Sequence, residues 1–160
     1  MTEEIKLRLI SDISEMETLL RRYVSETSEI LTTDIDETLE EILGRREETI
    51  ALIGERRRDI DLCGEELTPE ERDILKRIIT NNHVPLGISK DLREIHKTAV
   101  NMRSVLLEAK EKDKQAALRV DARVKELRSE LENVNDDKRK VDLYSNAPTN
   151  NKGGSFDSHL

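Results

Sequence analysis

The sequence is poor in the residues that fill the interior of a compact enzyme. Among 160 residues there are two Tyr, one Phe and no Trp, with six Gly and three Pro. Aromatic residues make up 2% of the chain and charged residues 39%. This composition excludes an ordinary compact α/β enzyme and is typical of long helices that share a narrow Leu and Ile core. We therefore expect an all-α fold.

Cysteine and long apolar runs are also scarce. Cys63 is the one cysteine, so it cannot form a disulfide within the chain. No stretch approaches the roughly 20 apolar residues of a membrane-spanning helix. Met1 is followed by Thr-Glu-Glu, which is not the start of a secretory signal peptide. We expect a cytoplasmic protein that does not insert into membranes.

The acidic residues are concentrated in the first half of the chain. Up to Leu67 there are 19 acidic and 9 basic residues, a net charge of −10, whereas the remainder has 16 acidic and 18 basic, a net charge of +2. An acidic half argues against a nucleic-acid partner, because nucleic acid requires clustered Lys and Arg. The difference in charge favours packing of the two halves on each other, although ordinary solvated helix faces give the same pattern.

The best-determined feature is an apolar stripe from Leu92 to Val141. Its residues recur in alternating steps of three and four, with an extra step of four after Val120, and only Asp113 and Lys138 interrupt it. This repeat predicts one helix, roughly 75 Å long, that another helix must cover along one side. The extra step is a stutter, which locally unwinds a supercoil without ending the helix.

Three further helices are predicted before this one. Each of the four helices begins at or directly after a residue suited to cap it, namely Thr2, Asp34, Thr68 and Ser89. The predicted helices cover residues 3–32, 35–63, 69–81 and 89–143. The first two are similar in length and joined by a short turn, so we expect an antiparallel hairpin. The predicted fold is an elongated antiparallel helical bundle or coiled coil of three long helices plus one short helix.

Three glycines lie in or directly after the second predicted helix. Gly64 is the expected residue just after its C-terminus. Gly44 and Gly54 lie inside it and cost about 1 kcal/mol each relative to Ala; we interpret them as marks of a weak helix rather than of close helix packing. Its predicted inner side carries Ile35, Leu39, Ile42, Leu43, Ile50, Ile53 and Ile60.

The composition changes near the C-terminus. Residues 145–160 are polar and aperiodic and contain Pro148, Gly153 and Gly154, which predicts a flexible tail. The domain prediction is therefore a single helical domain over 1–144 followed by this tail.

No group of residues predicts catalysis, a metal site or a cofactor. The segment from Asp34 begins like a calcium loop, but Leu39 stands where Gly is required and Arg45 where Glu is required. The three His residues are dispersed and do not pair with Cys63 at metal-ligand spacing. Neither a phosphate-binding glycine loop nor a nucleophile elbow is present. We expect neither an enzyme nor a cofactor-binding protein.

The second part of the stripe is the remaining candidate surface. The first two predicted helices are each about 45 Å long, so they can cover only part of the long helix. The apolar edge from about Leu118 to Val141 is then incompletely covered. Three outcomes are open: the long helix kinks near 111–114 and folds back, a homodimer buries the edge, or a partner helix binds it.

The second predicted helix reads DETLEEIL at 36–43 followed by RREETIALI at 45–53. With this segment and the order of its helices, the chain resembles the FlgN-type flagellar export chaperones over nearly its whole length. The ending, with Tyr144 and then GGSFD at 153–157, is also similar to the loose ending of that family. The chain departs from the family in its last residues, which read SHL at 158–160 rather than the basic-Ala finish often seen.

The resemblance implies a cytoplasmic chaperone that holds hook-associated flagellar subunits before type III export. The helical ends of these subunits would bind along the C-terminal part of the long helix. The contact residues that the resemblance implies are Leu118, Val120, Val124, Leu127, Leu131, Val134, Val141 and Tyr144. The alternative hypothesis is a homo-oligomeric coiled-coil scaffold or adaptor in which the same edge pairs with its own copy.

Overall fold

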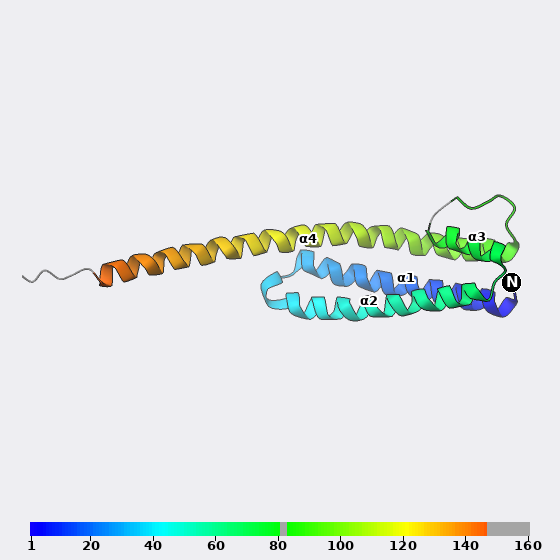
Figure 1. The fold of residues 1–160 in the computed structure, drawn as a ribbon, viewed down its shortest axis with the longest axis horizontal. Helices are drawn as coiled ribbons and strands as arrows, with labels where there is room; N and C mark the ends of the chain where they lie inside the picture. The colour runs from blue at the N-terminus through cyan, green and yellow to red at the C-terminus, as the bar shows by residue number, and fades with distance from the viewer. Residues whose placement is uncertain (81–82, 147–160) are drawn as a thin grey trace, which may run out of the picture. The chain divides into compact units, whose positions relative to one another are not determined.

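A computed structural model describes residues 1–80 and 83–146, and over these residues the chain is all-α with four helices, as predicted (Figure 1). The helices are α1 (Glu3–Thr32), α2 (Ile35–Glu65), α3 (Pro69–Thr80) and α4 (Lys90–Ser145). Residues 81–82, which include the predicted end of the third helix, and residues 147–160 of the predicted tail lie outside the described residues. The tail is predicted to begin at Ser145, but α4 continues through this residue. Within the described part of the chain, no helix combines the length and apolar character that crossing a membrane requires.

The helices begin at the residues that the sequence identifies as caps. Thr2, Asp34 and Ser89 each accept a hydrogen bond from an amide of the turn that follows. Thr68 and Glu71 form a reciprocal capping box: the Glu71 amide donates to Thr68 Oγ1 over 3.3 Å, and the Thr68 amide donates to Glu71 Oε2 over 3.2 Å. Two donors that lack partners within the helix are thereby satisfied.

The prediction that Gly64 follows the end of α2 is wrong. The helix continues through Gly64 to Glu65, and its C-cap residue Glu66 has an ordinary right-handed conformation with φ of −77°. Arg72 explains the difference, since its guanidinium donates to the carbonyls of Gly64 (3.0 Å) and Glu65 (2.6 Å). A side chain from α3 thus caps the helix, so no left-handed glycine is needed.

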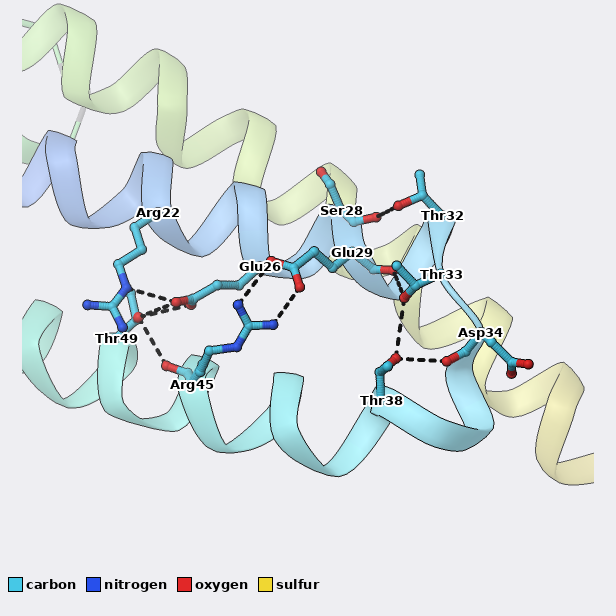
Figure 2. A network of polar contacts seen from close by, with 10 residues as sticks. All are labelled: Arg22, Glu26, Ser28, Glu29, Thr32, Thr33, Asp34, Thr38, Arg45 and Thr49. Carbon is cyan, nitrogen blue, oxygen red and sulfur yellow. Dashed lines mark hydrogen bonds and ion pairs between the residues drawn. The ribbon is translucent and has the colours of Figure 1, made fainter.

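Polar contacts show that α1 and α2 form an antiparallel hairpin. Arg45 near the start of α2 binds Glu29 near the end of α1, whereas Arg56 further along α2 binds Glu15 nearer the start of α1. Figure 2 shows the Arg45 guanidinium directed at the Glu29 carboxylate, with contacts of 3.1 and 2.5 Å. Exposed ion pairs contribute about 0–1 kcal/mol each, so they fix the alignment of the hairpin more than they stabilise it.

Within Met1–Val120, the first part of α4 runs parallel to α1. Lys6 at the start of α1 lies 3.5 Å from Asp91, and Arg119 donates to the carbonyl of Ile30 over 2.6 Å. Residue numbers therefore increase in the same direction along the two helices, so α1 and this part of α4 are parallel. Between these ends, Leu92, Ile95, Ala99 and Met102 turn inward and are at most 2% exposed.

The core of this region consists of two apolar clusters. The larger cluster joins residues of all four helices; its most deeply buried members are Leu9, Ile13, Cys63, Ile78, Ile95 and Ala99. The smaller cluster lies at the turn of the hairpin and contains Ile30, Ile35, Ile42 and Ala116, with Leu31, Leu39 and Val120 partly buried against it.

Asp113, which interrupts the apolar stripe, belongs to a polar contact among three helices. Its carboxylate accepts hydrogen bonds from the Tyr23 hydroxyl of α1 (2.7 Å) and from the Arg46 guanidinium of α2 (2.5 Å). The same guanidinium lies 4.8 Å from the centre of the Tyr23 ring, which is cation–π distance. Burial and the bond to Asp113 raise the pKa of Tyr23. The interruption is therefore a paired polar group rather than a defect of the stripe.

The chain divides into two compact units, Met1–Val120 and Asp121–Leu160. α4 contributes to both, and residues 111–114, where a kink was one alternative, are part of this helix without a break. The single helical domain predicted over 1–144 stays a prediction.

Candidate partner-binding surface

The candidate surface lies on the part of α4 that follows Val120. Five of the predicted contact residues have side chains between 39% and 64% exposed: Val124, Leu127, Leu131, Val134 and Val141. Successive members are separated by three, four, three and seven residues, which places them on one side of the helix. These five residues are called the C-terminal stripe below. It extends over roughly 26 Å of helix.

The other three predicted contact residues do not belong to this stripe. Val120 is partly buried against the smaller apolar cluster in the first unit. Leu118 is two residues from both Ala116 and Val120, so it points roughly 160–200° away from the stripe, and it is 71% exposed. Tyr144 follows Val141 by three residues and lies roughly 120° from the centre of the stripe. The sequence periodicity already separates Leu118 from its neighbours, because it breaks the steps of three and four.

Charged residues surround the C-terminal stripe. Arg123 binds Glu126 (3.1 Å) and Glu130 (3.4 Å), and Lys125 binds Asp121 (3.1 Å). These are exposed contacts within one helix, each worth a few tenths of a kcal/mol. They stabilise α4 itself and leave the apolar side chains uncovered.

Lys138 lies within the stripe, between Val134 and Val141. It makes no ion pair within residues 1–80 and 83–146. A helix packed on the stripe must therefore either place a carboxylate opposite this ammonium group or let its flexible side chain reach water. In a parallel, in-register pair of identical helices, the two Lys138 side chains would face each other.

Neither a metal-binding cluster nor a reactive cysteine is found in the part of the chain that the structure describes. The residues that the structure describes contain no group of three or more His, Cys, Asp or Glu side chains placed to hold a metal ion. Cys63 is fully buried, and burial raises the pKa of its thiol, so the thiolate required for nucleophilic chemistry is disfavoured.

The prediction for the inner side of α2 is wrong at two residues. Leu43 and Ile50 are 40% and 52% exposed, whereas Ile42 and Thr49, one position earlier in each case, are buried. Thr49 can occupy the inner side because its hydroxyl donates to the Glu26 carboxylate over 2.9 Å, as Figure 2 shows. An apolar pattern does not reveal that a threonine is buried. The pattern therefore assigned Ile50 to the core in place of Thr49.

No protein-family model, curated protein or solved structure matches this chain.

Proposed function

We propose that this protein is a cytoplasmic export chaperone of the FlgN type. In this proposal it binds hook-associated flagellar subunits through the C-terminal stripe and keeps them competent for type III export. The antiparallel bundle of three long helices and one short helix is part of the same proposal. The observation that supports it best is the set of five apolar side chains on one exposed side of α4. The resemblance in sequence supports the identity of the cargo.

The size of the stripe suits a partner that must be released again. Burying a Val or Leu side chain fully contributes about 1.5–3 kcal/mol, and these side chains are already partly covered. Burial of the stripe would thus contribute on the order of 5 kcal/mol, before the loss of translational freedom. Further contacts from the charged flanks would be needed for micromolar affinity, which requires about 8 kcal/mol. Weak, reversible binding is what a protein that delivers its cargo requires.

The alternative is a coiled-coil scaffold in which two copies pair through the stripe. Lys138 argues against the parallel, in-register form of such a pair, because two ammonium groups would meet in an apolar interface. An antiparallel pair avoids this clash and remains the competing arrangement. It predicts a dimer that has no need of cargo.

The test replaces Leu127 and Leu131 together by Asp in the full chain. Each protein is used to capture partners from a lysate of the native cell, followed by mass spectrometry. We expect the unsubstituted chain to recover hook-associated subunits and the double variant to recover none. The matched control is Leu7→Asp with Leu62→Asp, two leucines of comparable exposure (56% and 57%) on α1 and α2.

Two other results would overturn the proposal. A stable dimer by light scattering that recovers no flagellar subunit would favour the scaffold. A large loss of helicity by circular dichroism in the Leu127 and Leu131 variant would show that these side chains are part of a core.

A further inference from the structure

Lys138 places a positive charge in line with the apolar residues of the C-terminal stripe. It follows Val134 by four residues and precedes Val141 by three, so its side chain leaves α4 on the same side as theirs. It is exposed, and no acidic group among residues 1–80 and 83–146 lies within ion-pair distance of its ammonium group. An interface formed on the stripe would therefore include an unpaired cation.

The helix itself offers Lys138 little compensation. Ion pairs within a helix join residues three or four positions apart, and the one acidic residue at these distances from Lys138 is Asp142. Asp142 lies on the C-terminal side, which is the less favourable order for a basic and an acidic residue. Lys125, by contrast, binds Asp121, the acidic residue four positions before it. A stable carboxylate partner for Lys138 must therefore come from another helix.

The two edges of the C-terminal stripe are charged as well. Glu130 and Asp137 are seven residues apart and follow one edge, whereas Arg128 and Asp142 are fourteen residues apart and follow the other. Asp137, Arg128 and Asp142 make no ion pair within the part of α4 that the structure describes. Residues at the edges of an apolar stripe lie beside those of the helix that packs on it, so these charges influence which helix can bind.

The charges disfavour a second copy of this chain as that helix. In a parallel, in-register pair, Asp137 of one copy would lie beside Asp142 of the other, and the two Lys138 side chains would meet. In the antiparallel pair that matches all five apolar residues, Glu130 of one copy would lie beside Asp137 of the other. Each contact between carboxylates would occur twice, because the pair is two-fold symmetric. Like charges placed together destabilise an interface, so the stripe favours a helix of another protein.

We propose that the C-terminal stripe selects a helix of a different protein that carries one carboxylate in its apolar side, opposite Lys138. The inference rests on the proposed function in one respect, namely that the stripe receives a partner helix. It adds the chemistry that this helix needs. It also assigns Lys138 the role of setting the alignment, since a single polar position within an apolar seam specifies how two helices pair.

Lys138 can discriminate because the residues that could face it differ in cost. A carboxylate neutralises the ammonium group as water leaves it. A neutral side chain leaves the charge without a partner unless the lysine bends toward water, and a second lysine adds repulsion. A shift of the bound helix by one turn would move its carboxylate about 5 Å along α4, so the same contact also selects the register.

The probe is a designed helical peptide of about 18 residues with a fluorescent label, which matches the length of the stripe. It has Leu at the apolar positions, in steps of three and four, and Gln on both flanks. One apolar position, the one that would face Lys138, carries Glu, Gln or Lys. The set is made twice, once for a peptide lying parallel to α4 and once for an antiparallel one.

Fluorescence anisotropy at low salt measures the binding of each peptide to the full chain. In the set that has the correct orientation, we expect the Glu peptide to bind about five- to tenfold more tightly than the Lys peptide, with the Gln peptide between them.

A charge reversal on the protein tests the same contact from the other side. Lys138→Glu should reverse the order, so that the Lys peptide binds most tightly. Lys140→Glu is the matched control: it makes the same change of charge at an exposed residue on roughly the opposite side of α4, and should leave the order unchanged. Leu127→Asp with Leu131→Asp should abolish the binding of every peptide, because all of them bind on the stripe.

Three results would overturn the inference. No peptide could show saturable binding, or the order of the peptides could be the same for Lys138→Glu as for the unsubstituted chain. In the third, light scattering of the free chain would show a dimer that Leu131→Asp dissociates, which would make a second copy the occupant of the stripe.

The proposed function can fail separately. If the peptides bind in the expected order but the chain captures no flagellar subunit from the native lysate, the identity of the cargo is wrong and the selectivity at Lys138 stands. If the subunits are captured but Lys138→Glu leaves the order of the peptides unchanged, the reverse holds.

Discussion

The two parts of α4 carry the same apolar repeat but differ in what covers it. In the first part, Ile95 and Ala99 are fully buried and Met102 is 2% exposed. In the second, Leu131 and Val141 are 63% and 64% exposed. The helix, the spacing and the residue types are alike, so the periodicity alone does not set the difference in burial. An apolar repeat shows that one side of the helix should pack against another helix. It does not show whether that second helix belongs to the same chain.

The polar residues that interrupt the repeat do distinguish the two parts. Asp113 meets Tyr23 and Arg46, one from each helix of the hairpin. Lys138 has no ion-pair partner among the described residues. Asp113 is only partly buried, but its two partners come from both helices that pack against this stretch, so the paired interruption marks a covered stretch. An unpaired interruption is typical of a surface that is still open.

The largest expected effect compares one apolar truncation in each part of α4. Ile95→Ala removes a side chain with no exposed surface and should lower the free energy of unfolding by about 2–5 kcal/mol through lost burial and the cavity left behind. Leu131→Ala, at a 63% exposed position, should change it by less than about 0.5 kcal/mol. Urea unfolding followed by circular dichroism measures both. Equal losses in the two variants would contradict the difference in burial.

A smaller effect is expected from substituting Asp113 or Lys138, the two polar residues that interrupt the apolar repeat of α4. Asp113→Asn removes the charge that binds Tyr23 and Arg46 and should lower the free energy of unfolding by about 1.5–2 kcal/mol. The lower half of the range for charged hydrogen bonds applies because the Asp113 side chain is 44% exposed. Lys138→Gln is the matched control and should be neutral. Urea midpoints that shift equally for both would show that Asp113 is no better paired than Lys138.

Much of the fold could be predicted from the sequence because local chemistry determines it. Thr68 and Glu71 form their capping box from residues three apart, and Pro69 takes the first helical position of α3, where no amide donor is needed. The long repeat that starts at Leu92 likewise predicts one helix without reference to the rest of the chain. Features that depend on neighbours in sequence are therefore the predictable ones.

What could not be predicted depends on residues far apart in the chain. The end of α2 is set by Arg72 of α3, and the side that α2 buries is set by the bond from Thr49 to Glu26 of α1. For the candidate site, the repeat identified the five residues of the C-terminal stripe. It could not identify Leu43 and Ile50 as exposed, because the inner side of α2 is occupied instead by Ile42 and by Thr49, whose partner Glu26 lies on another helix.

The glycines of α2 offer a test in the opposite direction, since substitution should stabilise the chain. A Cβ built on Gly44 or Gly54 meets nothing within 4 Å, which supports the interpretation as a weak helix and excludes close helix packing there. Gly44→Ala and Gly54→Ala should each raise the free energy of unfolding by about 0.5–1 kcal/mol.

The control for these gains is Gly87→Ala, measured by the same urea unfolding. Gly87 has φ of +87°, where Ala is strained, so this change should destabilise the protein. If Gly54→Ala destabilised the chain as well, another group would have to occupy the space beside Gly54.

The smallest expected effect is on the pH dependence of the free energy of unfolding. It arises from the α1–α2 hairpin and not from the C-terminal stripe. The hydrogen bonds from Arg45 lower the pKa of Glu29. A carboxyl whose pKa is lower in the folded state stabilises that state above its unfolded pKa, near 4.5, and this contribution is lost as the pH falls through the folded value. The free energy of unfolding should thus decrease between about pH 5 and pH 3.

Glu29→Gln should remove part of this decrease, whereas Glu55→Gln, an exposed glutamate of the same hairpin, should not. An equal acid dependence in both variants would mean that the pair with Arg45 aligns the two helices without stabilising them, and the two apolar clusters would then carry the stability of the hairpin alone.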